Sequence, residues 1–234
     1  MSILAFLYGM SFFSIEPISS RLKEQMIRAN SWREGCPVRI EDLRLIRVPY
    51  LGFDNREHIG NMIVHKSVAS EVLEIFKELK EIGYPIENIS LVSEYRNKKE
   101  LLSSNITSSF NCRLMTGSRY KWSKHSYGKA IDINPTQNPY IRKSTILPIE
   151  GKKYIGKKRA HTSNKPSNRA IILKDDKIVK IFKKYGWIWG GDWKSLKDYH
   201  HFEKRYNYSF NKKKKSIKKL FKRVTISEDC DEAF

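Results

Sequence analysis

The sequence has no long apolar run, few cysteines and few acidic residues, and each shortage limits what the chain can be. No stretch of about 18 or more residues is wholly apolar, so the sequence offers no full membrane-spanning helix. Residues 3–15 form a shorter apolar segment with the length of a signal-peptide core. It lacks a basic start and a small-residue cleavage site, so a secretory leader and a buried N-terminal helix both stay open.

Cysteine occurs three times, at Cys36, Cys112 and Cys230. These residues form no CxxC pair, which argues against a structural zinc knot. In an exported protein Cys36 and Cys112 could form a disulfide and leave Cys230 free. Buried free thiols fit the same spacing equally well.

Acidic residues are outnumbered, with 25 Asp and Glu against 45 Lys and Arg, for a net charge of +20. Such an excess implies an anionic partner, namely nucleic acid, a membrane surface or an acidic polymer, unless it is only a solvated basic surface. The sequence contains no motif of a nucleic-acid-binding module, so nucleic acid is not an expected partner.

The basic residues are densest near the C-terminus, where eight of the 45 fall between Lys212 and Arg223. Ile217, Leu220 and Phe221 lie among these lysines, a pattern typical of an amphipathic helix on a membrane or on an anionic wall polymer. A disordered solubilising tail fits equally well. We therefore divide the chain into an apolar leader (1–20), a main domain (21–208) and a basic tail (209–234).

Apolar periodicity predicts the elements of the main domain. Helical spacing predicts helices over residues 67–84 and 176–185, each closed by a glycine. Alternating or β-branched segments predict strands over residues 62–65, 89–95, 129–134 and 198–203. This order predicts an α+β fold, with helices packed against a small, largely antiparallel sheet.

The first candidate site is His125 followed seven residues later by Asp132, on the polar face of a predicted strand. Imidazole nitrogen and carboxylate oxygen are ligands that zinc accepts together. Alone, the pair fits a surface turn with a locally hydrogen-bonded aspartate better than a metal site.

The second candidate site is the segment from Asp198 to Glu203, which contains two adjacent histidines. A regular strand would place Asp198 and His200 on one face and His201 on the other. A turn or bulge at Tyr199 would instead bring His201 beside Asp198. The residues alone do not decide between the two histidines.

Three tryptophans precede that segment, and they could line a pocket or pack in the core. They are Trp187, Trp189 and Trp193. Arg96, at the end of a predicted strand, is a third candidate, because a guanidinium can hold an oxygen that develops negative charge. Three other histidines have no partner at ligand spacing and are interpreted as structural or exposed. They are His58, His65 and His161.

The sequence contains, in this order, the segments SKHSYGKAIDINPTQNPY, GWIWGGDW and DYHHFE. Together they resemble the D-alanyl-D-alanine carboxypeptidase (VanY-type) zinc peptidases. Relatives of that family include vancomycin-resistance D,D-dipeptidases and phage L-alanyl-D-glutamate endopeptidases. The family pattern is S-x-H, six residues, D, and later D/E-x-x-H. The resemblance extends from about Cys36 to Glu203, and SEYR and ITSSFNCR are also typical of it.

This resemblance implies a Zn²⁺ ion held at the sheet by His125, Asp132 and His201, since His201 is the last residue of D-x-x-H. It implies that Asp198 is the general base. Arg96 and Ser123 occupy positions of substrate-binding residues in the family, with Arg96 on the carbonyl oxygen.

The resemblance also implies a function and a location. The expected activity is hydrolysis of an amide bond in peptidoglycan stem peptides, with D-Ala-D-Ala carboxypeptidase preferred over L-Ala-D-Glu endopeptidase. A non-catalytic basic module that binds the cell wall is the alternative class. The relatives look exported, so a periplasmic or envelope location and a Cys36–Cys112 disulfide are expected. The lysine-rich tail is not a feature of the family.

Overall fold

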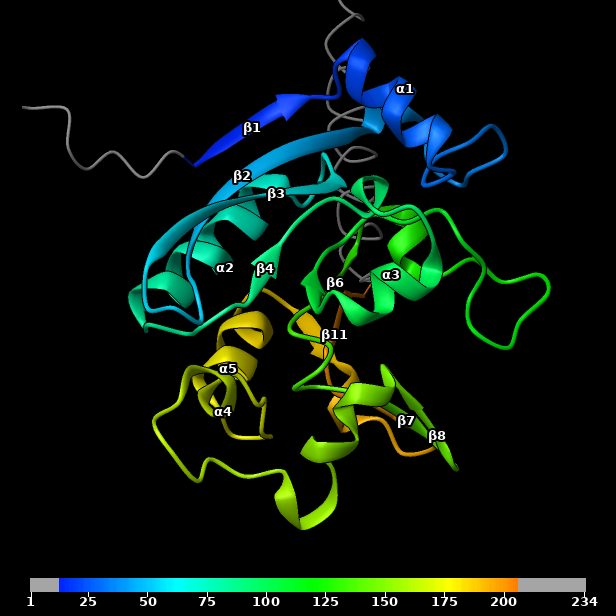
Figure 1. Ribbon diagram of the computed structural model, residues 1–234. Helices are drawn as coiled ribbons and strands as arrows, with labels where there is room; N and C mark the ends of the chain where they lie inside the picture. Colours follow the sequence, from blue (N-terminus) through cyan, green and yellow to red (C-terminus); the bar gives the residue numbers. More distant parts are fainter. Residues whose placement is uncertain (1–12, 206–234) are drawn as a thin grey trace, which may run out of the picture. The chain divides into compact units, whose positions relative to one another are not determined.

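The computed structural model describes residues 13–205, in which short strands and helices alternate along the chain (Figure 1). The strands are β1 (Ser14–Pro17), β2 (Leu43–Leu51), β3 (Glu57–His65), β4 (Asn88–Ile89), β5 (Ile106–Thr107), β6 (Ala130–Asp132), β7 (Tyr140–Arg142), β8 (Thr145–Leu147), β9 (Trp187–Trp189), β10 (Lys197–Asp198) and β11 (His201–Lys204). The α-helices are α1 (Ser20–Arg28), α2 (Ala69–Glu81), α3 (Lys98–Ser103), α4 (Pro166–Arg169) and α5 (Lys177–Lys184). Among the described residues, no helix combines the length and hydropathy needed to cross a bilayer.

The strands form four small sheets within residues 13–205. Strands β1, β2 and β3 make one antiparallel sheet, and β6, β11 and β9 make a second with β11 in the middle. A third antiparallel sheet has the order β10-β7-β8, whereas β4 and β5 pair in parallel. The predicted α+β class with largely antiparallel pairing is therefore confirmed, with the strands distributed over several sheets.

The main core lies between α2, α5 and the sheets. Helix α2 places Val72, Ile75, Phe76 and Leu79 in this core and packs on β2 (Figure 1). Phe182 of α5 stacks on Phe202 of β11, with ring centroids 3.9 Å apart. Because Phe202 is fully buried, β11 is anchored in the core through its apolar face.

A second apolar cluster joins α1 to the end of the β2–β3 hairpin at which β2 begins and β3 ends. It contains Met26, Leu43, Ile63 and Phe110, among other residues. A disulfide between Cys36 and Cys112 closes this region, and such bonds form and persist in oxidising compartments. This pairing, expected from the family resemblance, is consistent with an extracytoplasmic protein.

Both predicted helices are present, as α2 and as α5 with Asp176 at its N-cap. The strand predicted over residues 62–65 is the end of the longer β3, and that over residues 129–134 contains β6. The first three elements, β1, α1 and β2, were not predicted. Residues 14–17 of the expected leader form β1 in the sheet, while the rest of its apolar segment, apart from Phe13, and the basic tail fall outside the described residues.

The strand predicted over residues 89–95 is wrong beyond its first residue. Only Asn88 and Ile89 pair as β4, and the chain then turns through a 3-10 helix, Val92–Glu94. The hydroxyls of Ser90 and Tyr95 lie 2.8 Å apart, and Asn88 Nδ2 donates to both of them at 3.0 and 3.2 Å. These local polar contacts compete with an extended ladder and fold the segment back.

Gly128 connects the site-forming segment to β3. Its φ of 60° is in the left-handed region, its carbonyl accepts the N–H of His65 at 2.9 Å, and an added Cβ would lie 2.5 Å from that nitrogen. We expect Gly128→Ala to lower the free energy of unfolding by about 3 kcal/mol, since backbone strain and a backbone clash add.

Gly156 is the matched control for this substitution. It has the same φ of 60°, but nothing lies within 4 Å of the position that an added Cβ would take. Gly156→Ala should cost only about 1 kcal/mol in denaturant unfolding. Equal losses of unfolding free energy for the two variants would show that the close approach of Gly128 to His65 does not contribute to stability.

Candidate metal centre

Strand pairing brings two of the predicted ligands together. In the β6–β11 ladder, His201 is the antiparallel partner of Asp132. Directly opposed residues on one face of a sheet hold their side chains close together. Asp132 Oδ1 and His201 Nδ1 are accordingly 3.0 Å apart.

The third ligand comes from a short 3-10 helix, Lys124–Tyr127, that precedes β6. Ser123 caps this helix, and its Oγ accepts the N–H of His125 at 3.3 Å. The helix ends at Gly128 in the left-handed conformation. Because the chain then enters β6, the ring of His125 faces the Asp132–His201 pair.

The three ligand atoms form a compact triangle. His125 Nε2 lies 3.1 Å from Asp132 Oδ1 and 3.2 Å from His201 Nδ1. A tetrahedral zinc ion with bonds of about 2.0–2.1 Å requires ligand atoms about 3.3 Å apart. Both histidines are buried, and Asp132 is partly exposed to solvent. The donor set and its spacing therefore fit zinc.

Neighbouring acceptors orient both imidazoles. His125 Nδ1 donates to the carbonyl of Ser109 at 2.6 Å, and His201 Nε2 donates to Glu203 Oε2 at 3.2 Å. With those nitrogens protonated, the lone pairs of the other two ring nitrogens point at the triangle. Metal-binding histidines are typically held this way by a carboxylate or a backbone carbonyl.

The charges of the site demand a cation among the three ligand atoms. Burial disfavours ionised Asp132, but the attraction of His125 and His200 outweighs it and holds the pKa of Asp132 well below its ordinary value. Burial also opposes a charged His201, yet hydrogen bonds to Asp132 and Glu203 raise the pKa of His201 to about 10. A metal ion bound by these residues would displace the proton of His201, so metal binding and proton release would be coupled.

His200 lies beside this triangle and is not part of it. The predicted strand over residues 198–203 is interrupted at Tyr199 and His200, because β10 pairs with β7 whereas β11 pairs with β6 and β9. His200 Nδ1 donates to the carbonyl of Asn138 at 2.7 Å. The turn at Tyr199, one of two alternatives the sequence left open, thus selects His201 for the cluster.

Asp198 and His200 form a partly buried ion pair beside the triangle. His200 Nε2 is 2.9 Å from Asp198 Oδ1 and 3.7 Å from Asp132 Oδ2, in an electrostatic contact without good hydrogen-bond alignment to Asp198. Burial would lower the pKa of His200, but the charges of Asp198 and Asp132 raise it to about 9. His200 is therefore a cation that links a predicted ligand to the predicted base.

Only one of the three tryptophans is at the site. Trp187 and Trp189 are buried in the main core, whereas the partly exposed Trp193 lies against His201, with ring centroids 5.4 Å apart. Arg96 is outside the cluster, in the bend before α3, where its exposed side chain pairs with Glu100 at 3.3 Å. Ser123 is buried and acts in the described structure as the cap of the His125 helix.

The other histidines have structural contacts of their own, as the sequence predicted. His58 contacts Asp54, His65 contacts Ser67, and His161 contacts the carbonyl of Ile171. Sequence reasoning missed Glu203, although its position two residues after His201 puts it on the same strand face. It also missed the Ser109 and Asn138 carbonyls, for which no side-chain signal exists.

The fold gathers two imidazoles and a carboxylate that could hold a metal ion on a small antiparallel sheet. Residues 116–204 match the family model described as D-alanyl-D-alanine carboxypeptidase, and this segment is a domain of that family. The matched segment contains the whole His125–Asp132–His201 triangle together with Asp198. Searches of curated proteins and of solved structures gave no match.

The geometry predicts opposite effects for the adjacent histidines. His201→Ala removes a ligand atom, so the purified variant should lose its zinc. His200→Ala should keep zinc near the wild-type content, because His200 faces Asp198 and Asn138 instead. Metal analysis by mass spectrometry measures both; the reverse pattern would support a regular strand across residues 198–203.

Proposed function

We propose that this protein is a zinc-dependent peptidase that hydrolyses an amide bond in peptidoglycan stem peptides, with D-Ala-D-Ala carboxypeptidase as the preferred activity. The observation that carries the proposal is the His125–Asp132–His201 triangle, with Asp198 beside it, inside the family-matched segment. Catalytic zinc sites have three protein ligands and structural zinc sites usually have four, so a set of three residues fits a catalytic site. The Cys36–Cys112 disulfide supports an exported protein, where this substrate is found.

The zinc ion would supply Lewis acidity, which polarises a carbonyl oxygen and lowers the pKa of water. The remaining chemistry falls to the protein's own side chains. Asp198 accepts a proton from the attacking water and passes it to the leaving amine. Its Oδ1 faces His200, so Oδ2 is the atom assigned to this transfer.

His200 has a positioning role in this mechanism. It is itself held by the carbonyl of Asn138, and its Nε2, 2.9 Å from Asp198 Oδ1, holds the Asp198 carboxylate close to the triangle. A general base must lie within reach of the proton that it abstracts, so holding Asp198 in place serves the proposed proton transfer.

Arg96 and Ser123 are assigned to the substrate. Arg96 would hold the oxygen of the scissile carbonyl as charge develops, a contribution of about 3–4 kcal/mol for donors of this kind. Its exposed side chain pairs with Glu100, and an ion pair at such a solvent-accessible position is weak enough for a substrate to replace Glu100. The hydroxyl of Ser123, the residue that caps the helix containing His125, is the second proposed contact with the substrate.

Asp198→Ala tests the proposed base. We expect turnover to disappear while zinc stays at about one ion per chain, since Asp198 is outside the ligand triangle. Asp192→Ala is the matched control, because Asp192 is a nearby exposed aspartate that pairs with Lys183 at 2.7 Å. An active Asp198→Ala variant would remove Asp198 from the mechanism.

Digestion of purified peptidoglycan tests the function itself and identifies the bond. Mass spectrometry should detect free D-alanine and shortened stem peptides, and a chelator should abolish their release. Split stem peptides without free D-alanine would identify the endopeptidase alternative of the same family. Stoichiometric zinc without hydrolysis of any wall peptide would instead support a non-catalytic wall-binding module.

A further inference from the structure

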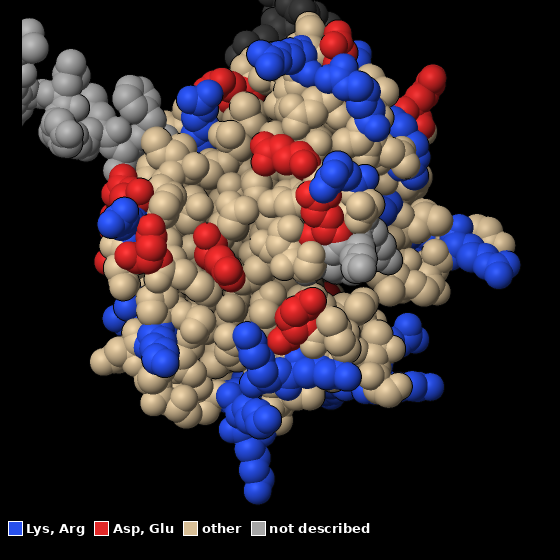
Figure 2. All heavy atoms as spheres, viewed as in Figure 1, with Lys and Arg blue, Asp and Glu red and all other residues tan. Residues whose placement is uncertain are grey.

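Acidic residues are scarce in the middle of the chain, so this segment carries much of the net positive charge. Residues 101–174 contain fifteen Lys and Arg but only two acidic residues, Asp132 and Glu150. One of those two belongs to the metal triangle. Figure 2 shows Lys and Arg along the lower, right and upper edges of this face, with most acidic side chains in its middle and on its left.

A projecting loop is the most exposed part of this region. We call residues 113–122 the finger; it leaves the main body just after Cys112 and returns just before the His125 helix (Figure 1). It contains Arg113, Arg119 and Lys121 and no acidic residue. Gly117 of the finger lies next to Arg142 of β7, since an added Cβ would be 3.1 Å from that guanidinium.

The finger has a defined conformation. Met115 N–H donates to the carbonyl of Lys121 at 2.8 Å, and Leu114 forms a β-bridge with Trp122. The Ser118 hydroxyl accepts the N–H groups of Tyr120 and Lys121 at 3.2 and 2.9 Å. These hydrogen bonds hold the backbone of the finger in a defined conformation.

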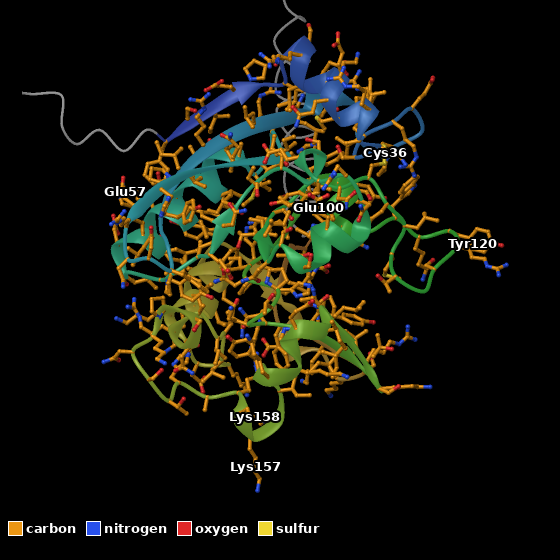
Figure 3. The ribbon with its side chains drawn as sticks, viewed as in Figure 1. Cys36, Glu57, Glu100, Tyr120, Lys157 and Lys158 are labelled. Carbon is orange, nitrogen blue, oxygen red and sulfur yellow. A yellow bond between two sulfur atoms is a disulfide. The ribbon has the colours of Figure 1, made fainter. Side chains whose placement is uncertain are left out.

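The exposed side chains of the finger are apolar as well as basic. Tyr120 is 87% exposed, Met115 46% and Leu114 37%, and Tyr120 marks the far end of the finger in Figure 3. Single exposed apolar residues are common on protein surfaces. Three of them on one ten-residue projection, interleaved with exposed Arg119 and Lys121, form instead the combination that binds the interface of an anionic bilayer.

We propose that the finger docks the protein on an anionic lipid membrane. Tyr120, Met115 and Leu114 enter the interfacial region, and Arg119, Lys121 and Arg142 contact the lipid phosphates. Charge alone would equally suit a soluble polyanion, but a polyanion offers no apolar region to receive the three apolar side chains. Because the finger leads directly into the His125 helix, docking would also hold the metal centre close to the membrane surface.

Co-sedimentation of the full-length protein with lipid vesicles tests this proposal. Vesicles of phosphatidylcholine with about one third phosphatidylglycerol should bind the protein, and pure phosphatidylcholine should bind it much less. Met115→Ser with Tyr120→Ser should weaken binding to the anionic vesicles about tenfold. Ile59→Ser is the matched control, because Ile59 is 59% exposed on β3, away from the finger.

A tryptophan placed at the tip reports on the finger separately from the basic tail. The Tyr120→Trp variant adds one tryptophan, and its fluorescence is obtained by subtracting the spectrum of the wild-type protein. This difference spectrum should shift to the blue on anionic vesicles and be quenched by brominated phosphatidylcholine. Added emission that stays unchanged while the protein is bound would overturn the proposal. So would unchanged binding of the double serine variant, or binding that is lost completely in high salt, as expected for a polyanion site.

Discussion

The pairing of β6 with β11 is the constraint on which the rest of the site depends. It places Asp132 and His201 directly opposite each other, and the short helix before β6 adds His125. Three ligand atoms then lie 3.0–3.2 Å apart in a largely buried position. Lone pairs at such distances repel unless a cation lies among them, so the fold itself creates a demand for a proton or a metal. Phe202, stacked on Phe182 in the core, keeps β11 in the register that produces this arrangement.

The sequence predicted the parts of this molecule that depend on local periodicity. Helices α2 and α5 have clear apolar faces, and the residues of the metal triangle occur at spacings that a family pattern identifies. The choice of His201 over His200 required that pattern, because strand periodicity depends on whether the chain turns at Tyr199. That turn arises from pairing with two different sheets, and a partner distant in the sequence leaves no local signal.

The same reasoning explains the other differences. The segment after Ile89 has strand-forming residues, but the side chains of Asn88, Ser90 and Tyr95 bond to one another and turn the chain. Backbone acceptors such as the Ser109 carbonyl, which orients His125, depend only on position and leave no trace in residue type. The family match begins at residue 116, so Ser109, whose carbonyl orients His125, lies before the matched segment.

The two adjacent histidines divide the chemistry of the site. His201 Nδ1 is one corner of the triangle, whereas His200 forms an ion pair with Asp198. The central claim, that His125, Asp132 and His201 hold zinc, is tested most directly by X-ray absorption at the zinc edge of the purified protein. The structure predicts two imidazole nitrogens and a carboxylate oxygen among the ligands at about 2.0–2.1 Å, without sulfur. A single imidazole, or sulfur at about 2.3 Å, would contradict this assignment.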